Sequence, residues 1–194
     1  MEFTELVVKR RSIRKFRQDL VDNTVIERIL EAGRWAPSAS NSQPWRFIVI
    51  TETGIRRKIA ENSTQFSKEA WRKFPPESAR YLAARGGSWD KSTMARVPVF
   101  VAVCFRLVEN IRDELVLGSV WMAVENMLLA AANEGLGSCI YTFYNMQEED
   151  KIKEILQVPE DYRIACLIQL GYGDTAPAPP SRKPLTEIVS YQHF

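Results

Sequence analysis

The spacing of hydrophobic and polar positions changes along the chain, and each spacing predicts an element. Apolar residues recur at helical spacing between Val25 and Leu30, which predicts a helix from about Thr24 to Trp35. Asp22 or Asn23 is placed to cap this helix, because a short polar side chain accepts hydrogen bonds from the first free amides. Shorter helices are predicted over Phe3 to Arg11, Ile55 to Asn62 and Glu148 to Leu156.

Continuous apolar runs predict the strands. The run from Val97 to Phe105 is typical of a strand that is covered on both faces. Arg112 to Glu134 is predicted to be a long helix that is apolar almost all round, so it must be buried on nearly every side, and a second subunit could share it. The other candidate strands are Arg46 to Thr51, Leu136 to Phe143 and Tyr162 to Leu170. The order of elements predicts an α+β domain with helices layered on a central sheet.

The rest of the chain carries weaker signals. Phe66 to Arg85 is mixed, because two adjacent prolines break any long helix there, and Gly86 to Met94 is predicted to be a loop. The tail from about Ala176 is rich in proline and becomes apolar over Leu185 to Val189, so it must dock on its own domain or on a partner. No repeat or linker divides the sequence, and we expect a single domain over residues 1–194.

The composition is that of an ordinary globular protein. The chain has 194 residues, 45% hydrophobic and 26% charged, with a net charge of +2. Because its Lys and Arg residues are scattered, the charge gives no support for binding nucleic acid or an anionic membrane. The N-terminus lacks the features of a secretory signal, and the most apolar stretch, Leu115 to Val124, is too short to span a bilayer. We therefore expect a cytoplasmic protein in which Cys104, Cys139 and Cys166 are buried thiols.

Hydrolytic chemistry and a Rossmann-type dinucleotide-binding fold are both disfavoured. The single histidine, His193, lies beside the chain end, which is usually too mobile for a catalytic base, and closely spaced zinc ligands are missing. The Gly-Tyr-Gly segment at 171–173 follows a predicted strand, but Pro177 and Pro179 prevent the helix that a dinucleotide fold needs there. The Gly-Leu-Gly segment at 135–137 is predicted to end the long helix.

Three polar clusters remain as candidates for a binding site. Residues 10–14 (Arg-Arg-Ser-Ile-Arg) carry guanidinium groups that match phosphate oxygens. Residues 37–43 join a helix to a strand, and their small side chains let a flat ligand approach the backbone. The amides of Asn41 and Gln43 donate and accept together, which suits a ring edge with alternating N–H and C=O groups. Arg182 and Lys183 form the third cluster. Each cluster alone also fits an ordinary solvated surface.

Together the clusters resemble the nitroreductase-like family of flavoproteins. The resemblance rests on Arg-x-Ser-x-Arg from Arg10, Pro-Ser-x-x-Asn-x-Gln-Pro-Trp from Pro37, Gly-Leu-Gly-Ser-Cys from Gly135, and Gly-Tyr-Gly followed by Arg-Lys-Pro-Leu near the end. It covers nearly the whole chain except about Glu61 to Met94. It implies an α+β sandwich with a mainly antiparallel sheet and a domain-swapped homodimer. Two non-covalently bound FMN molecules would lie at the subunit interface, and the C-terminal tail would dock on the partner.

The same resemblance implies which residues bind FMN. Arg10, Ser12 and Arg182 are implied to hold the phosphate, with Arg11 and Lys183 close by. Arg14 is implied near the N1/O2 edge of the ring, where a cation tunes the reduction potential. The residues implied for the ring are Pro37, Ser38, Ala39, Ser40, Asn41, Gln43, Ile140, Tyr141 and Thr142. Part of the 37–43 loop would come from the other subunit, and a backbone N–H near Thr142 would face N5. Family members often have a glycine in the 140–144 segment, which this chain lacks.

The implied activity is that of an FMN-dependent NAD(P)H oxidoreductase. NADH or NADPH would give a hydride to flavin N5, and a nitroaromatic, quinone or similar small-molecule acceptor would then take its place, in a ping-pong sequence that needs no nucleophilic side chain. Three alternatives stay open. One is the same fold with other chemistry, such as reductive dehalogenation or flavin fragmentation. The second is a protein that stores or senses FMN, and the third is a structural dimer that binds anions. The segment from Glu61 to Met94 often forms the substrate lid in this family, and its aromatic residues could stack on a substrate or pack in a core.

Overall fold

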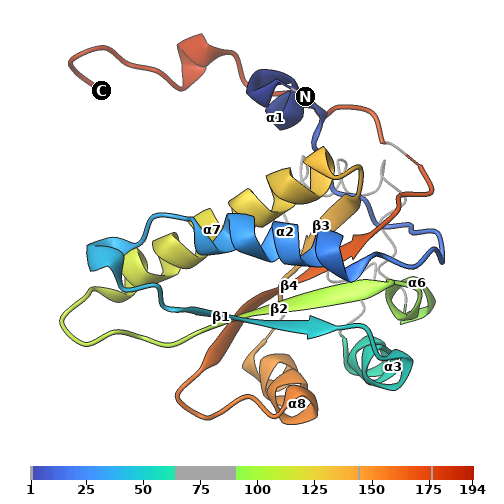
Figure 1. Cartoon of the computed structure of the whole chain (residues 1–194). Helices are drawn as coiled ribbons and strands as arrows, with labels where there is room; N and C mark the ends of the chain where they lie inside the picture. The colour runs from blue at the N-terminus through green and yellow to red at the C-terminus, as the bar shows by residue number, and fades with distance from the viewer. Residues whose placement is uncertain (1, 64–90, 144, 176) are drawn as a thin grey trace.

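A sheet of four antiparallel strands forms the centre of the described chain, which comprises residues 2–63, 91–143, 145–175 and 177–194 of the computed structural model (Figure 1). The strands are β1 (Trp45–Ile50), β2 (Val99–Phe105), β3 (Gly137–Tyr141) and β4 (Arg163–Gly171). Their order is β1-β2-β4-β3, and each neighbouring pair is antiparallel. The predicted α+β fold with an antiparallel sheet is therefore confirmed.

Helices cover the sheet on both faces (Figure 1). One face carries α2 (Asn23–Arg34) and α7 (Asp113–Asn133). The other carries α3 (Thr53–Asn62), α6 (Lys91–Ala95) and α8 (Met146–Leu156). The short helix α1 (Phe3–Lys9) and the 3₁₀ turn η2 (Leu185–Glu187) lie beyond the layer of α2 and α7 (Figure 1).

Strand β2 shows why the sheet is buried between two layers. Val99, Val101 and Val103 join a hydrophobic cluster with α2 and α7, whereas Phe100 and Ala102 join a second cluster with α3 and α8. None of these side chains is more than 2% exposed. The prediction of a strand covered on both faces is confirmed.

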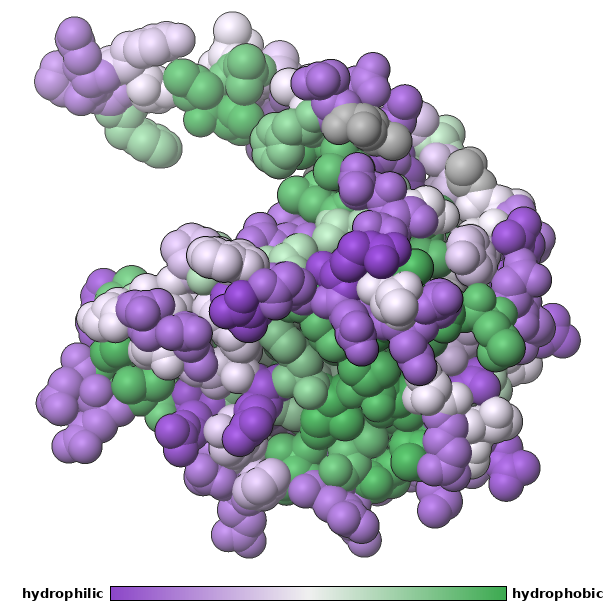
Figure 2. Space-filling model, viewed as in Figure 1, coloured by the Kyte–Doolittle hydropathy of each residue, from purple (hydrophilic) through white to green (hydrophobic). Residues whose placement is uncertain are grey.

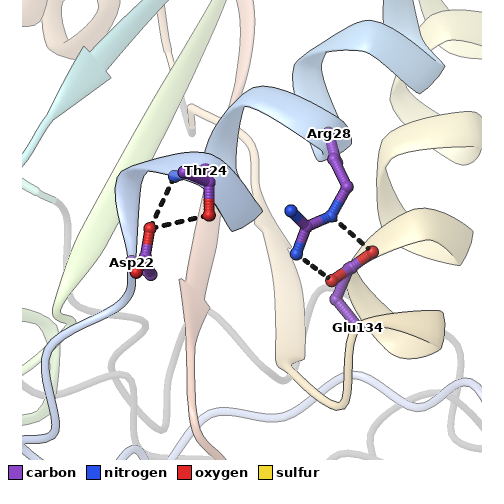
Figure 3. Close-up of polar contacts among 4 residues, drawn as sticks. All are labelled: Asp22, Thr24, Arg28 and Glu134. Carbon is purple, nitrogen blue, oxygen red and sulfur yellow. Dashed lines mark hydrogen bonds and ion pairs between the residues drawn. The ribbon is translucent and has the colours of Figure 1, made fainter.

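Helices α2 and α7 approach each other closely. A Cβ on Gly33 would lie 2.8 Å from Met127 Cγ, so the absence of a side chain permits this contact. Arg28 of α2 donates two hydrogen bonds, of 3.0 and 2.7 Å, to Glu134 at the C-terminal end of α7 (Figure 3). This paired contact fixes the orientation of the layer that will carry the candidate site.

The predicted elements agree with the observed ones to within two residues at each end, except in one segment. Asp22 caps α2 as predicted, accepting from the Thr24 N–H at 2.7 Å (Figure 3). The loop predicted over Gly86 to Met94 is wrong where the chain is described, because residues from Lys91 form α6. Met94 is 2% exposed in the second cluster, and this tertiary contact stabilises a very short helix. The mixed segment before it, with its aromatic residues, lies outside the described residues.

Helix α7 is buried on one side and exposed on the other in the single chain, whereas burial nearly all round was predicted. Leu115, Leu117 and Met122 are 38–45% exposed. By length and composition alone α7 could cross a membrane, but it lies against α2 and the sheet as a core helix does. The apolar positions of α7 therefore predict burial on more sides of the helix than a single chain provides.

The tail over residues 177–194 projects from the body as an arm. Figure 2 shows an open gap between this arm and the body, with hydrophobic surface on the arm. Leu185, Ile188 and Tyr191 are each at least 62% exposed. Within one chain the apolar segment of the tail meets solvent, and its docking on a partner stays a prediction.

Candidate functional site

The cationic segment, residues 10–14, lies along the edge strand β3. The Ile13 N–H donates to the Ser138 carbonyl at 2.8 Å, and Ser12 forms a parallel bridge with Ser138. Gly137 permits this approach, because a Cβ there would lie 2.8 Å from the side chain of Ile13. The Gly-Leu-Gly motif thus has a second role besides ending a helix: it lets the arginines reach the sheet.

The end of β4 holds the same segment from the other side. The Asp174 N–H donates to the Lys15 carbonyl at 3.0 Å, and a Cβ on Gly173 would lie 3.2 Å from Ile13. Between Asp174 and Pro184 the described residues contain no helix, so the glycines after β4 serve close packing and not a dinucleotide-binding turn.

A pocket opens between the cationic segment and the C-terminus of α7. Gly135 has a φ of +78°, and the Leu136 N–H donates to the Ala131 carbonyl at 2.8 Å, which ends the helix as predicted. The pocket has a volume of about 310 Å³, and Arg10 and Arg11 lie on its cationic side. A small anionic group fits this combination of charge and space.

Arg10 and Arg11 are held in different ways. Arg10 Nε lies 3.4 Å from Glu125 Oε1 of α7. Arg11 donates to the carbonyl of Arg10 at 2.5 Å and to the carbonyl of Val8, so it caps the end of α1. Sequence reasoning did not identify Glu125, since a carboxylate on a long helix gives no signal of its own.

The pKa of Cys139 on β3 is affected by the charges of the cationic segment. Burial raises the pKa of this thiol, while Arg14, a hydrogen bond from Ser12 and Arg10 act in the opposite direction. Groups that favour a thiolate also favour a phosphate oxygen. Arg10, Ser12 and Arg14 are therefore brought together beside β3, as the resemblance implies.

The loop of residues 37–43 joins α2 to β1 and contains the 3₁₀ turn η1 (Ala39–Asn41). Ser40, Asn41 and Gln43 have φ angles of 51°, 53° and 45°, all in the left-handed region. A non-glycine residue there costs on the order of 1 kcal/mol or more, so the surroundings must impose the conformation. Backbone of this kind clusters at binding and catalytic sites.

Two hydroxyl groups fix this loop. The Gln43 N–H donates to Ser38 Oγ at 3.0 Å, and the Ala39 N–H donates to Ser119 Oγ, also at 3.0 Å. Ser119 lies on α7 and is 1% exposed. Sequence reasoning missed it, although it is the single hydroxyl residue of α7 and could have been noticed for that reason.

The outer side of the loop presents amide groups. Asn41 and Gln43 are exposed, and Gln43 Nε2 donates to Asn41 Oδ1 at 3.2 Å. Beside them, Ser42 Oγ is buried without a hydrogen-bond partner among the described residues. Buried hydroxyl groups are nearly always hydrogen-bonded, so Ser42 is an exception among the described residues.

The three residues from Ile140 to Thr142, which the resemblance implies for the ring, lie at the end of β3 and their side chains point in different directions. Ile140 packs with the cluster beneath α7, and Tyr141 lies in the opposite cluster, where its hydroxyl donates to the buried Glu148. Thr142 is exposed. A flat ring over this strand end can meet Ile140, Thr142 and the backbone, while Tyr141 anchors the strand from below.

The structure does not bring the third cluster to the other two. Arg182 and Lys183 are exposed on the arm, and within the described part of the chain neither makes a hydrogen bond or ion pair. Their positions in the single chain therefore add no charge to the pocket beside β3.

The two candidate halves of the site lie at opposite ends of α7 (Figure 1). The 37–43 loop meets α7 at Ser119, and the pocket beside the cationic segment meets it at Ala132. At 1.5 Å per residue, about 20 Å of helix separates these contacts. One chain thus presents the pocket beside the cationic segment near one end of the molecule and the polar 37–43 loop near the other.

Comparison with known proteins identifies the class. Residues 7–172 match the Nitroreductase family, so this chain belongs to the nitroreductase family of oxidoreductases. A protein of Bacillus subtilis provisionally named NAD(P)H nitroreductase YfhC is 28% identical, with 94% of this chain and 90% of the relative covered. An iodotyrosine deiodinase of Thermotoga neapolitana is 27% identical, with 98% and 97% covered.

Solved structures show the same fold. The crystal structure of an oxidized iodotyrosine deiodinase bound to FMN and 3-iodo-L-tyrosine has a TM-score of 0.82 and 24% identity, with 100% of both chains covered. A BluB-like flavoprotein of Clostridium difficile 630 has a TM-score of 0.77 and 25% identity, again with 100% of both chains covered. These likenesses show that the chain shares the fold of both proteins, the first of which holds FMN.

Proposed function

We propose that this protein is an FMN-dependent NAD(P)H oxidoreductase that reduces a nitroaromatic, a quinone or a similar small acceptor by a ping-pong mechanism. The observation that carries the proposal is the pair of features that α7 holds: a cationic pocket beside β3 and a strained polar loop with exposed amides. The first suits a phosphate and the second suits the edge of a flat, polar ring. FMN contains both groups.

The described residues fit the phosphate end of FMN. Arg10 and Ser12 would hold the phosphate, and Gly137 lets the segment that carries them lie against β3. The Arg10–Glu125 contact is long, at 3.4 Å, and half-exposed, so a phosphate can replace the carboxylate at little cost. Arg14 would lie further along, near the ring.

The 37–43 loop fits the ring end. Asn41 and Gln43 would meet the pyrimidine edge, and the unpaired hydroxyl of Ser42 offers one more polar group. Ile140 and Thr142 would lie against the ring from β3. When bound, the flavin supplies reversible acceptance of a hydride, while these residues orient the ring and keep water from it.

We further propose that two chains build each site. The two halves lie about 20 Å apart along α7, so a partner placed head to tail would bring its loop to this chain's pocket. Leu117 and Met122 of α7 are exposed and apolar, as a dimer interface requires. The arm would cross to the partner, carrying Arg182 and Lys183 towards its phosphate. The protein would work in the cytoplasm, where free buried thiols such as Cys166 persist.

Reductive deiodination is a second candidate, because relatives named iodotyrosine deiodinase match this chain over at least 88% of its length. It needs the same flavin site and a different substrate pocket. Most of the segment that would form that pocket, Glu61 to Met94, lies outside the described residues.

The test is an anaerobic stopped-flow experiment on the FMN-loaded protein. NADH and NADPH are mixed in separately and the flavin absorbance band is followed. We expect rapid bleaching with one or both donors and recovery when a nitroaromatic or quinone is added. Recovery with 3-iodotyrosine alone would favour deiodination. A protein that binds FMN but resists both donors would refute NAD(P)H oxidation, and failure to bind FMN would refute the whole proposal.

A further inference from the structure

Ser119 is an unusual residue for its position. It lies in the middle of the apolar stretch of α7 and is 1% exposed, with Val116, Val120 and Ala123 as buried neighbours on the same helix. A buried hydroxyl in such surroundings must find hydrogen-bond partners or weaken the fold. Ser119 Oγ donates to the Leu115 carbonyl at 2.7 Å, one turn earlier.

The same oxygen also accepts a hydrogen bond from outside the helix. The Ala39 N–H donates to Ser119 Oγ at 3.0 Å. Among the described residues, this hydrogen bond joins the backbone of the 37–43 loop to α7, across 80 residues of sequence. The bond to the Leu115 carbonyl orients the hydroxyl, so that its lone pairs face the loop.

The loop needs an external anchor. Ser40 and Gln43 have left-handed φ angles, which cost free energy for residues of these types, so the surroundings must support the conformation. The internal contacts, from Gln43 to Ser38 and to Asn41, close the loop on itself but do not fix its distance from α7. Ala39 starts η1, so its position sets where the following residues lie.

We infer that Ser119 is a positioning residue for the cofactor: through the Ala39 N–H it holds the exposed amides of the 37–43 loop at the flavin ring. This inference rests on the proposed function, because it names the part of α7 that sets the ring-edge contacts. Ser119 is buried and touches neither ring nor substrate. Its effect passes entirely through the loop backbone.

The first test is Ser119→Ala, with FMN affinity as the readout. Alanine has the highest helix propensity, so the helix itself is not weakened, but the Ala39 N–H loses its partner. We expect the dissociation constant of FMN to rise about tenfold, which corresponds to about 1.4 kcal/mol. The matched control is Ala123→Gly, one turn further along the same buried face, which weakens the helix but leaves FMN affinity unchanged.

A second measurement separates positioning from a general loss of stability. If Ser119 acts through the loop, Gln43→Ala costs less FMN affinity in the Ser119→Ala background than in the wild type. Additive effects, or an unchanged FMN affinity in Ser119→Ala, would overturn the inference. Ser119→Cys is the gentler variant if the alanine variant folds poorly, and we expect an intermediate loss because a thiol is a weak acceptor.

Hydrogen exchange without cofactor distinguishes this inference from the proposed function. In Ser119→Ala the Ala39 amide should exchange faster, while amides in the centre of α7 stay protected. Slow exchange at Ala39 in the variant would refute the anchoring role whatever the protein binds. Faster exchange in a protein that does not bind FMN would leave the anchor standing, refute its role at a flavin and refute the proposed function.

Discussion

Burial determines the chemistry of single residues in this protein, and the cysteines show it most directly. Burial raises the pKa of the Cys104 thiol to about 11 and that of Cys166 to about 12. Burial also raises the pKa of the Cys139 thiol, although the nearby Arg14 and Arg10 act in the opposite direction. All three thiols are therefore protonated near neutral pH and closed to reagents, so none is available as a nucleophile.

This makes a simple prediction for thiol labelling. The native protein should react very slowly with a thiol-specific disulfide reagent near pH 8, and all three thiols should react at once after denaturation. Absorbance of the released chromophore measures both rates. Fast labelling of one thiol in the native state would show that the described burial does not hold in solution.

Gly137 is the residue on which the cationic segment most depends. In Gly137→Ala the new Cβ would meet the branched Cβ of Ile13, which cannot move aside as the end of a flexible side chain can. We expect roughly 1–3 kcal/mol of destabilisation and at least tenfold weaker FMN binding, because the segment is pushed off β3. Fluorescence titration and chemical denaturation measure the two effects.

The control for this prediction is Gly54→Ala in the first turn of α3. The Cβ there would meet only the tip of the Glu52 carboxylate at 3.0 Å, which can move away. This variant should keep its FMN affinity and most of its stability. Equal FMN affinity in Gly137→Ala and the wild type would contradict the placement of the arginines beside β3.

At the scale of the elements, α2 makes several of its contacts through carboxylates. Hydrogen bonds from Arg34 and then Trp35 lower the pKa of Glu31 to about 2, and a hydrogen bond from Arg28 lowers that of Glu134. A carboxyl whose pKa is lower in the folded state stabilises the fold above its unfolded pKa. That stability is lost as the pH falls through the folded value.

We therefore expect the free energy of unfolding to fall between about pH 5 and about pH 2, with a shallower fall in Glu31→Gln. The effect should be modest and should shrink in high salt, because these groups are exposed. Urea unfolding followed by circular dichroism measures it. Glu27→Gln, on the same helix, is the control for the loss of one negative charge. An unchanged slope in Glu31→Gln would show that its contacts do not persist in solution.

Most of the elements could be predicted from the sequence, because their signals are local. The unbroken apolar run of β2 and the apolar stripe of α2 each indicate within a few residues which side chains are buried. α6 could not be predicted, since its stability comes from Met94 packing against residues far along the chain. For the same reason the contact of the Glu125 carboxylate with Arg10 could be found only in the structure.

For the candidate site, the sequence predicted the residue types and the structure added their grouping. Arg10, Ser12 and Arg14 do gather beside β3, and the loop is polar and strained as a ring-edge loop would be. The residues assigned to FMN stay predictions. What the spacing could not show is that the loop and the cationic segment meet α7 at different ends, because that depends on how α2 crosses α7.

At the scale of the whole molecule, the single chain leaves too much apolar surface exposed. Leu117 and Met122 on α7 and Ile188 and Tyr191 on the arm all meet solvent. A soluble chain rarely leaves such surface uncovered. The dimer proposed above would cover the helix and the arm together.

Removal of the arm tests the proposed dimer directly. A chain that ends before residue 177 should dissociate at concentrations where the full chain is a dimer, and it should bind FMN much more weakly. Light scattering after size exclusion measures the mass, and circular dichroism checks the fold. As a control, Leu20→Lys changes an apolar residue that is 94% exposed away from α7 and should leave the dimer intact. A monomeric full chain that still binds FMN would refute the shared site.

The placement of loop and pocket at opposite ends of α7 has a genetic consequence. If each site takes its loop from one chain and its pocket from the other, a chain damaged at Asn41 and a chain damaged at Arg10 fail in different halves. In a mixed dimer, both lesions fall into one site and the other site is assembled from two intact halves. Two inactive alleles expressed together would then give active protein, although neither allele gives active protein when it is expressed alone.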